Sequence, residues 1–265
     1  MILENIILGI IQGIAEWIPI SSEGLLVLVK SAFFSSGSLV ELVRLALFLH
    51  LGTFLAALIY FRKDVGRLFK TLFKPKGKKI EDKKTLKFLI ISTIITGIIG
   101  ILLLKTVLEL TSVMDVGVKV ITFGIGALLL ITAFLQIKSK SGFKTSKQIK
   151  IKDSILLGVM QGFAALPGLS RSGLTVSTLL LRKFDKTTAL KLSFLMSLPV
   201  VLFGNLILNL SDFAFNSNYL LALLFSFVFG FLTIHYLIKL SKKVNFGYFV
   251  LIFAILTIIA GFLLI

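Results

Sequence analysis

The sequence predicts an all-α polytopic membrane protein that forms a single membrane domain over residues 1–265. Of its 265 residues, 57% are hydrophobic and only 15% are charged, and the mean hydropathy is +1.02. A water-soluble domain cannot bury that much apolar surface. Apolar runs long enough to cross a bilayer recur along the chain, and short basic clusters separate them.

The first apolar region, residues 2–34, is interrupted near its middle by the sequence PISSEG at 19–24. A second region, 154–181, is interrupted in the same way by PGLSRSG at 167–173. Each half is shorter than the roughly 20 residues that a spanning helix needs. Both regions are therefore predicted to be re-entrant helical hairpins, which enter the membrane and return on the same side.

Six other runs are long and apolar enough to be transmembrane helices. They cover residues 42–61, 88–104, 119–137, 192–210, 219–238 and 246–265. Each hairpin is thus followed by three predicted spans.

The basic residues predict how these spans are oriented. Four segments, 62–87, 138–153, 182–191 and 239–243, hold 24 of the 29 Lys and Arg residues. Cytoplasmic loops are rich in Lys and Arg, so we expect Lys76 and Lys147 on the cytoplasmic side, and Asp115, Asn216 and both termini outside. The net charge of +17 then reflects loops near anionic lipid, with segment 62–87 as a basic cytoplasmic loop, and no nucleic-acid partner is expected.

The two halves of the chain are related by a shift of 149 residues. The shift aligns Gly9, Gln12, Gly13, Ala15, Ser21 and Gly24 with Gly158, Gln161, Gly162, Ala164, Ser170 and Gly173. Repeat one would cover 1–148 and repeat two 149–265. Since each half has three spans, an odd number, the second copy must be inserted upside down, which predicts an inverted-topology repeat with hairpin tips near the bilayer midplane.

The two hairpin tips carry ionisable and hydroxyl groups, which are costly at membrane depth and usually functional there. The first tip holds Glu16, Ser21, Ser22 and Glu23; the second holds Ser170, Arg171, Ser172 and Thr175. A new helix follows each tip, and its free N–H groups favour an anion. An arginine, carboxylates, hydroxyls and exposed amides together suit a phosphate ester or diphosphate.

Purely structural roles are the alternative for these groups. Ser21 and Ser22 could be helix N-caps. Arg171 could be a buried partner of Glu16 that locks the two hairpins together. His50 and His235 are expected to be polar groups satisfied between helices rather than ligands or bases.

The segments QGIAEWIPISSEG at 12–24 and PGLSRSGLT at 167–175 resemble the two signature motifs of the undecaprenyl-diphosphate phosphatase family, the bacitracin-resistance membrane phosphatases. The resemblance extends over essentially the whole chain. It implies catalytic roles for Glu16, Ser22 and Arg171. It also implies substrate-binding roles for Gln12, Ser21, Gly168, Ser170, Ser172, Gly173 and Thr175, and a divalent cation, Mg²⁺, with Glu16 and Glu23 as its candidate ligands.

The chain departs from the family pattern after the serine pair. The family commonly has Thr-Gly-His there, whereas this chain has Glu23-Gly24-Leu25, so the histidine often given a catalytic role is absent. Glu23 becomes a candidate catalytic replacement, with a helix-capping role as the alternative.

The expected function is hydrolysis of a polyisoprenyl diphosphate to the monophosphate at the plasma membrane, with an active site that opens to the outer face. This reaction would recycle the lipid carrier for envelope glycan synthesis. An inverted-repeat transporter or flippase is the rival expectation, because broken helices at the midplane are also common in transporters. A non-catalytic lipid-binding scaffold is the third.

Overall fold

The computed structural model describes residues 2–34, 39–113, 118–166, 168–208 and 217–263, and these segments are helical apart from their connections and one isolated β-bridge. The α-helices in these segments are α1 (Ile2–Ala15), α2 (Ser22–Phe33), α3 (Leu39–Tyr60), α4 (Arg62–Phe73), α5 (Ile80–Val113), α6 (Val118–Lys138), α7 (Ile151–Phe163), α8 (Arg171–Leu181), α9 (Lys186–Leu208), α10 (Ser217–Lys243) and α11 (Gly247–Leu263). A short 3-10 helix, η1 (Ser146–Gln148), precedes α7. The prediction of an all-α fold is confirmed.

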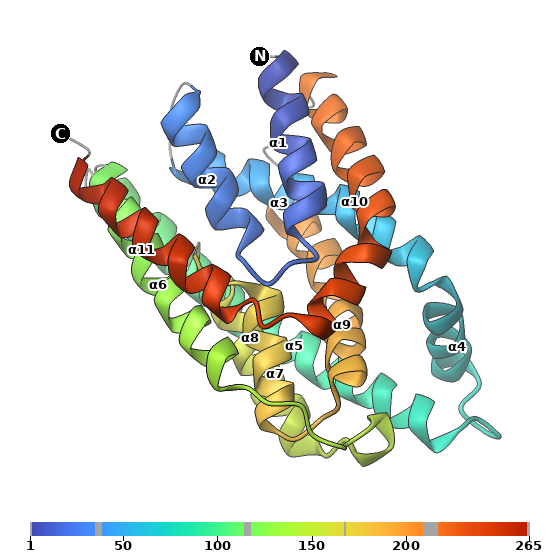
Figure 1. Cartoon of the computed structure of the whole chain (residues 1–265). Coiled ribbons are helices and arrows are strands. Elements are labelled where there is room, and N and C mark those ends of the chain that lie inside the picture. The colour runs from blue at the N-terminus through green and yellow to red at the C-terminus, as the bar shows by residue number, and fades with distance from the viewer. Residues whose placement is uncertain (1, 35–38, 114–117, 167, 209–216, 264–265) are drawn as a thin grey trace.

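Five of the six predicted spans are helices long and apolar enough to cross a membrane: α3, α5, α6, α9 and α10. The sixth, α11, has 17 residues and falls among the shorter apolar helices. It packs along α6, as Figure 1 shows. A multi-pass architecture is therefore present, while the spanning role of α11 stays a prediction.

The basic segment 62–87 is more ordered than the predicted loop. Its first part forms α4, and its last part forms the beginning of α5, so that only residues 74–79 connect the two helices. The physical reason is amphipathicity: Leu68 and Thr71 are buried on one face of α4, while Arg67 and Lys70 are exposed.

The two short-helix pairs, α1–α2 and α7–α8, approach each other tip to tip from opposite ends of the molecule (Figure 1). Their connections, residues 16–21 and 164–170, begin three residues before the predicted breaks. A residue that precedes a proline disfavours the helical conformation, which is consistent with an end of α1 shortly before Pro19. Pro167 lies outside the described residues.

Small residues let the hairpins pack closely on long helices. α1 packs on α10, and α7 packs on α5. A Cβ atom at Gly13 would lie 2.8 Å from the backbone of Gly230, and one at Gly162 would lie 2.7 Å from the side chain of Ile99. The glycines of both hairpins therefore allow the close helix contacts typical of small-xxx-small motifs in membranes.

The main buried cluster lies beside the tips and is built mainly from α3, α8, α9 and α10, with single residues from α4, α5 and α7. Trp17 is one of its members, only 2% exposed, with its indole N–H donating to the Gly230 carbonyl at 2.9 Å and its ring at 5.4 Å from that of Phe194. This cluster fixes the position of the first tip against α10.

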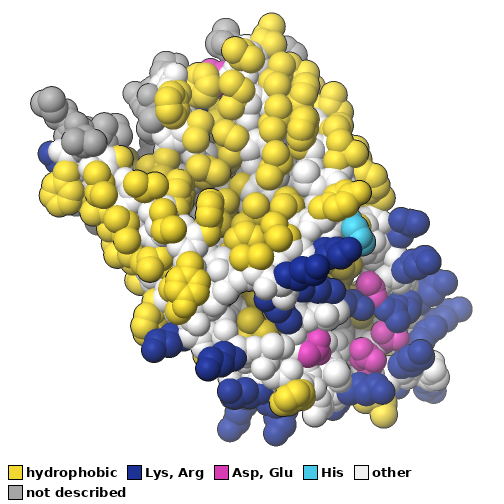
Figure 2. All heavy atoms as spheres, viewed as in Figure 1, with side chains coloured by type: hydrophobic (Ala, Val, Ile, Leu, Met, Phe, Trp, Pro, Cys, Tyr) yellow, Lys and Arg dark blue, Asp and Glu magenta, His cyan; other side chains and the backbone are white. Residues whose placement is uncertain are grey.

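Lys and Arg side chains gather at one end of the molecule, and hydrophobic side chains cover most of the remaining surface in Figure 2. The described part of the N-terminus lies toward the opposite end from the basic residues (Figure 1). Of the positions used for the predicted orientation, Lys76 and Lys147 are described, whereas Asp115 and Asn216 lie outside the described residues.

Candidate active site

The first hairpin tip presents two adjacent residues at the start of α2. Ser21 is the N-cap: its backbone is left-handed, with φ of 65°, and its hydroxyl accepts a hydrogen bond from the Gly24 N–H at 3.3 Å. A non-glycine residue in this conformation is strained, and the cap places Ser22 and Glu23 in the first helical turn. Both side chains line a central cavity.

The second tip has the same local design. Ser170 caps α8, its hydroxyl accepting from the Gly173 N–H at 3.0 Å, so that Arg171 becomes the first residue of the helix. The left-handed residue here is Gly168, with φ of 103°. The two tips touch, because a Cβ atom at Gly24 would lie 3.3 Å from the Cα of Gly168.

Glu16 is the centre of the cluster that the two tips form. Its Oε2 atom accepts hydrogen bonds from the Gln12 amide at 3.0 Å and from the Ser22 hydroxyl at 2.8 Å. The same oxygen lies 3.1 Å from Nε2 of His50. Its Oε1 atom pairs with the Arg171 guanidinium. Both carboxylate oxygens of a 6% exposed side chain are thus engaged.

Contacts with α9 hold Arg171 from behind. Its Nη1 atom donates to the Ser193 carbonyl at 3.3 Å, and its guanidinium carbon lies 6.0 Å from the centre of the Phe194 ring. Thr175 contributes indirectly: its hydroxyl donates to the Arg171 carbonyl at 2.8 Å and lies 2.6 Å from the Ser193 hydroxyl. This network orients the guanidinium toward the first tip.

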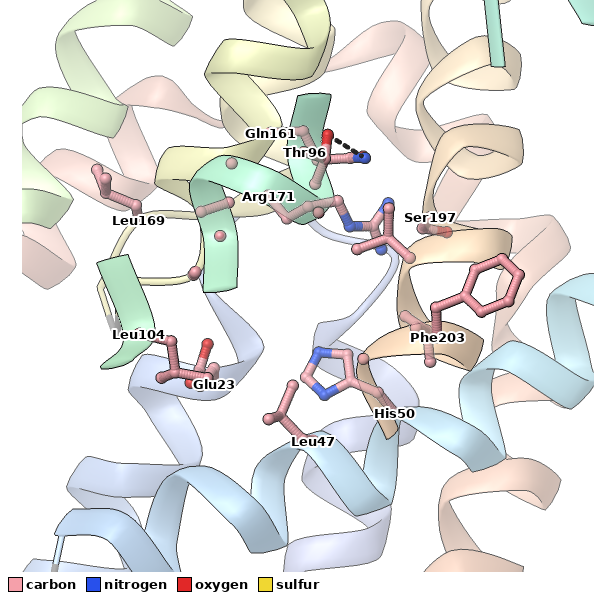
Figure 3. A pocket seen from close by; sticks show the side chains of 18 of the residues that line it. Glu23, Leu47, His50, Thr96, Leu104, Gln161, Leu169, Arg171, Ser197 and Phe203 are labelled. Carbon is pink, nitrogen blue, oxygen red and sulfur yellow. Dashed lines mark hydrogen bonds between the residues drawn. The ribbon is translucent and has the colours of Figure 1, made fainter. Parts of the chain in front are cut away.

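The cavity has a volume of about 520 Å³ and lies between the tips and helices α3, α5, α7 and α9 (Figure 3). Seven of the predicted site residues line it: Glu16, Ser21, Ser22, Glu23, Ser170, Arg171 and Ser172. The other four, Gln12, Gly168, Gly173 and Thr175, are buried behind this lining. The structure therefore brings the two sequence motifs together. Some of their residues line the cavity, and the others are buried behind the residues that line it.

His50 has polar partners on both ring nitrogens, as expected, but the sequence did not assign it to the site. It contacts Glu16 from α3, an element outside both motifs, and it lines the cavity. The sequence did contain a signal for this role, because His50 lies inside a predicted apolar span, and an ionisable residue there is a candidate functional group. His235 also has a polar partner on a neighbouring helix: its Nδ1 atom lies 3.1 Å from the Tyr60 hydroxyl at the surface.

Sequence reasoning also missed two polar atoms in the cavity wall. The Gln161 Oε1 and Thr93 Oγ1 atoms are buried, and neither has a hydrogen-bond partner among the described residues. The Gln161 amide N–H₂ donates to Thr96 at 3.3 Å, as Figure 3 shows. Unpartnered buried polar atoms are costly, so this part of the wall is suited to a hydrogen-bonding ligand or to water.

The described residues contain no group of three or more His, Asp or Glu side chains that could hold a metal ion. Glu16 uses both oxygens on protein partners. Glu23 lines the cavity, and none of the described residues pairs with its carboxylate. The donor set therefore suits a cation only if a ligand brings most of the coordinating oxygens, as phosphates do for Mg²⁺.

Together, fold and site define a class: a multi-pass helical membrane protein with a charged, hydroxyl-rich cavity buried among its helices. The comparisons with known proteins give the family. The family described as bacitracin resistance protein BacA matches residues 5–260, and the chain belongs to this family.

Several curated relatives carry the name undecaprenyl-diphosphatase. The protein of Methanococcoides burtonii is 43% identical over 264 residues, which cover 98% of each chain. That of Haloarcula marismortui is 36% identical over 272 residues, covering 99% of this chain and 98% of its own. That of Methanococcus vannielii is 35% identical over 253 residues, covering 93% and 95%.

Proposed function

We propose that this chain is a membrane hydrolase that removes the terminal phosphate from a polyisoprenyl diphosphate of the undecaprenyl type. The polyisoprenyl monophosphate that it releases is the lipid carrier of envelope glycan assembly. One observation carries the proposal: Arg171 meets Glu16 beside the Ser22 hydroxyl at the charged end of an apolar-walled cavity. The relatives named undecaprenyl-diphosphatase support the same reaction.

Substrate binding would use groups from both tips. Arg171 can bind two phosphate oxygens with its planar guanidinium. The helices α2 and α8 begin at Ser22 and Arg171, so the positive ends of their dipoles lie at the cavity. Glu16 pairs with Arg171, and the diphosphate would compete with this carboxylate for the guanidinium.

Two routes of attack fit the position of Ser22, whose hydroxyl donates to Glu16 at 2.8 Å. In the covalent route, Ser22 Oγ attacks the terminal phosphorus, its proton passes to Glu16, and the bond to the bridging oxygen breaks. The monophosphate leaves, and water then hydrolyses the phosphoserine. In the direct route, a water molecule that Glu16 deprotonates is the nucleophile.

The isoprenoid tail would occupy the apolar part of the cavity. Ile94 and Ile98 of α5 and Phe203 and Ile207 of α9 line this part, and they are 57%, 66%, 53% and 55% exposed. The cavity wall is therefore continuous with the apolar outer surface between α5 and α9. A lipid could keep its tail in the bilayer while its diphosphate reaches the tips.

A divalent cation, Mg²⁺ in our proposal, would be carried mainly by the diphosphate oxygens. When bound, it would neutralise negative charge on the phosphates. Of the two expected ligands, Glu23 is the better placed, because Glu16 already uses both oxygens.

We also propose an inverted repeat of residues 1–148 and 149–265, with two re-entrant hairpins and six spans in the plasma membrane. Corresponding helix contacts support it: α1 packs on α10 as α7 packs on α5. Lys and Arg side chains gather at the end of the molecule (Figure 2) that holds the α4–α5 connection and the segment between α6 and α7 (Figure 1), which supports a cytoplasmic location for Lys76 and Lys147. A site that opens to the outer face is part of the same proposal. The chain has no native cysteine, so a cysteine at position 76 can be labelled without background; labelling from outside intact cells would overturn this orientation.

Phosphate release by the purified protein in detergent tests the function. Polyisoprenyl diphosphates of several tail lengths are the substrates, and Arg171→Ala is the matched control. We expect equal amounts of inorganic phosphate and lipid monophosphate from the wild type, and release from the control at least about 100-fold slower. Substrate binding without release at any tail length would favour a transporter or a lipid-binding scaffold and reject the hydrolase.

A further inference from the structure

His50 lies at the charged end of the cavity, although it belongs to α3 and to neither sequence motif. Its side chain is 14% exposed, with Nε2 at 3.1 Å from Glu16 Oε2. Nδ1 lies 2.6 Å from the Ala46 carbonyl oxygen. Figure 3 shows the ring facing the same space as Glu23 and Arg171.

Both ring nitrogens of His50 lie against oxygen atoms that accept hydrogen bonds. A carbonyl oxygen and a carboxylate oxygen are both acceptors, so an imidazole between them satisfies both contacts only if each ring nitrogen carries a proton. His50 is then a cation. The charged groups that face it are Glu16 and Glu23 from the first hairpin and Arg171 from the second.

Glu16 therefore sits between two cations, Arg171 on Oε1 and His50 on Oε2. The two donors bind the two oxygens of one carboxylate, and two oxygens of a phosphate group could be bound by the same pair of donors. An incoming phosphate could take over both donors, which would leave Glu16 with Ser22 and Gln12. Glu16 would then keep its contact with the Ser22 hydroxyl, whose proton it can accept.

The first hairpin, residues 2–34, contains no histidine. Leu25 occupies the position of the usual histidine, and its side chain packs against an apolar cluster that includes Ile125 and Val250. It does not line the cavity. An imidazole reaches Glu16 from a different helix instead.

We propose that His50 is the second phosphate-binding cation of the site, which Glu16 holds in place beside Arg171 until the diphosphate takes over both cations. The proposal rests on the proposed function. It assigns to α3 a direct part in binding the diphosphate. A purely structural role, tying α3 to the first hairpin, is the outcome that the test must separate from it.

Inhibition by inorganic pyrophosphate, which lacks the lipid tail, probes this role directly. In His50→Gln the amide can still donate to Glu16, but the positive charge is lost. We expect the inhibition constant of pyrophosphate and the KM for the lipid to rise by about 10-fold or more, with thermal stability close to that of the wild type. His235→Gln, at the surface, is the matched control and should change neither constant.

His50→Leu, which removes the donor as well, should raise both constants further. If His50→Gln and His50→Leu bind pyrophosphate as the wild type does, the proposal is wrong, whatever happens to stability. A wild-type protein that releases no phosphate overturns the proposed function instead, and direct calorimetric binding of pyrophosphate to wild type and His50→Gln still decides the role of His50.

Discussion

The two hairpins share one scaffold and differ in chemistry. In each, a serine caps the second helix, and a glycine three residues later donates to its hydroxyl: Ser21 with Gly24, and Ser170 with Gly173. The residue after the cap is Ser22 in the first hairpin and Arg171 in the second, at positions related by the 149-residue shift. One tip thus presents a hydroxyl and the other a cation.

The difference extends to the residue that joins the tips. Glu16 corresponds to Ala165 under the same shift, so that the carboxylate comes from the first hairpin and its cationic partner from the second. The matching serines and glycines cap the helices and allow close packing, whereas the ion pair and the candidate nucleophile are formed by residues that differ between the hairpins. Each hairpin alone would carry an incomplete site.

The largest expected effect comes from removing the cation of the second tip. Arg171→Ala removes the ion pair between Arg171 and Glu16 and the cation that would bind the phosphate, so phosphate release should fall by at least about 100-fold. Arg171→Lys keeps the charge but loses the planar fork, and should cost about 10-fold or more. Near-normal turnover of the Ala variant in the phosphate-release assay would show that the site is assigned wrongly. Near-normal turnover of the Lys variant would reject only the binding of two phosphate oxygens by the planar guanidinium.

Removing the hydroxyl of the first tip separates the two routes of attack. Ser22→Ala should nearly abolish hydrolysis in the covalent route, with a folded protein by thermal unfolding. Ser21→Ala removes a cap and should mainly cost stability, about 1 kcal/mol, with a smaller loss of activity. Turnover by Ser22→Ala at more than about a tenth of the wild-type rate would favour water as the nucleophile.

A smaller effect is expected at the next position, where Glu23 corresponds to Ser172. Glu23→Gln should lower turnover by roughly 10-fold and raise the Mg²⁺ concentration needed for half-maximal activity, because the amide is a weaker cation ligand. A magnesium titration of both proteins measures this. If turnover and the magnesium titration are the same for both proteins, Glu23 has neither a catalytic nor a cation-binding role.

The smallest effects on activity should come from the packing glycines that the hairpins share. Gly13→Ala and Gly162→Ala place a methyl group where a Cβ atom meets neighbours at 2.8 Å and 2.7 Å. Each should destabilise the protein by about 1–3 kcal/mol. Gly124→Ala, on α6 with nothing within 4 Å of its Cβ position, is the control. If only one of the two variants lowers the unfolding temperature, the two hairpins are not packed equivalently.

Local properties of the sequence predicted much of this protein. Hydropathy and length identified the helices that became α3, α5, α6, α9 and α10, since burial in lipid requires an apolar run of sufficient length. Prolines and polar residues placed the two breaks within a few residues. The arginine, carboxylates and serines at those breaks identified the motifs that meet in the cavity.

Tertiary structure alone decided which of these residues touch. Spacing along the chain could not reveal that His50 of α3 reaches Glu16, or that Thr175 supports Arg171 from behind the lining. The amphipathic pattern of α4, by contrast, is present in the sequence, and the prediction of a loop overlooked it. Hydropathy and charge belong to a segment by itself, whereas a contact depends on the rotation and packing of two helices that are distant in sequence, which long-range packing determines.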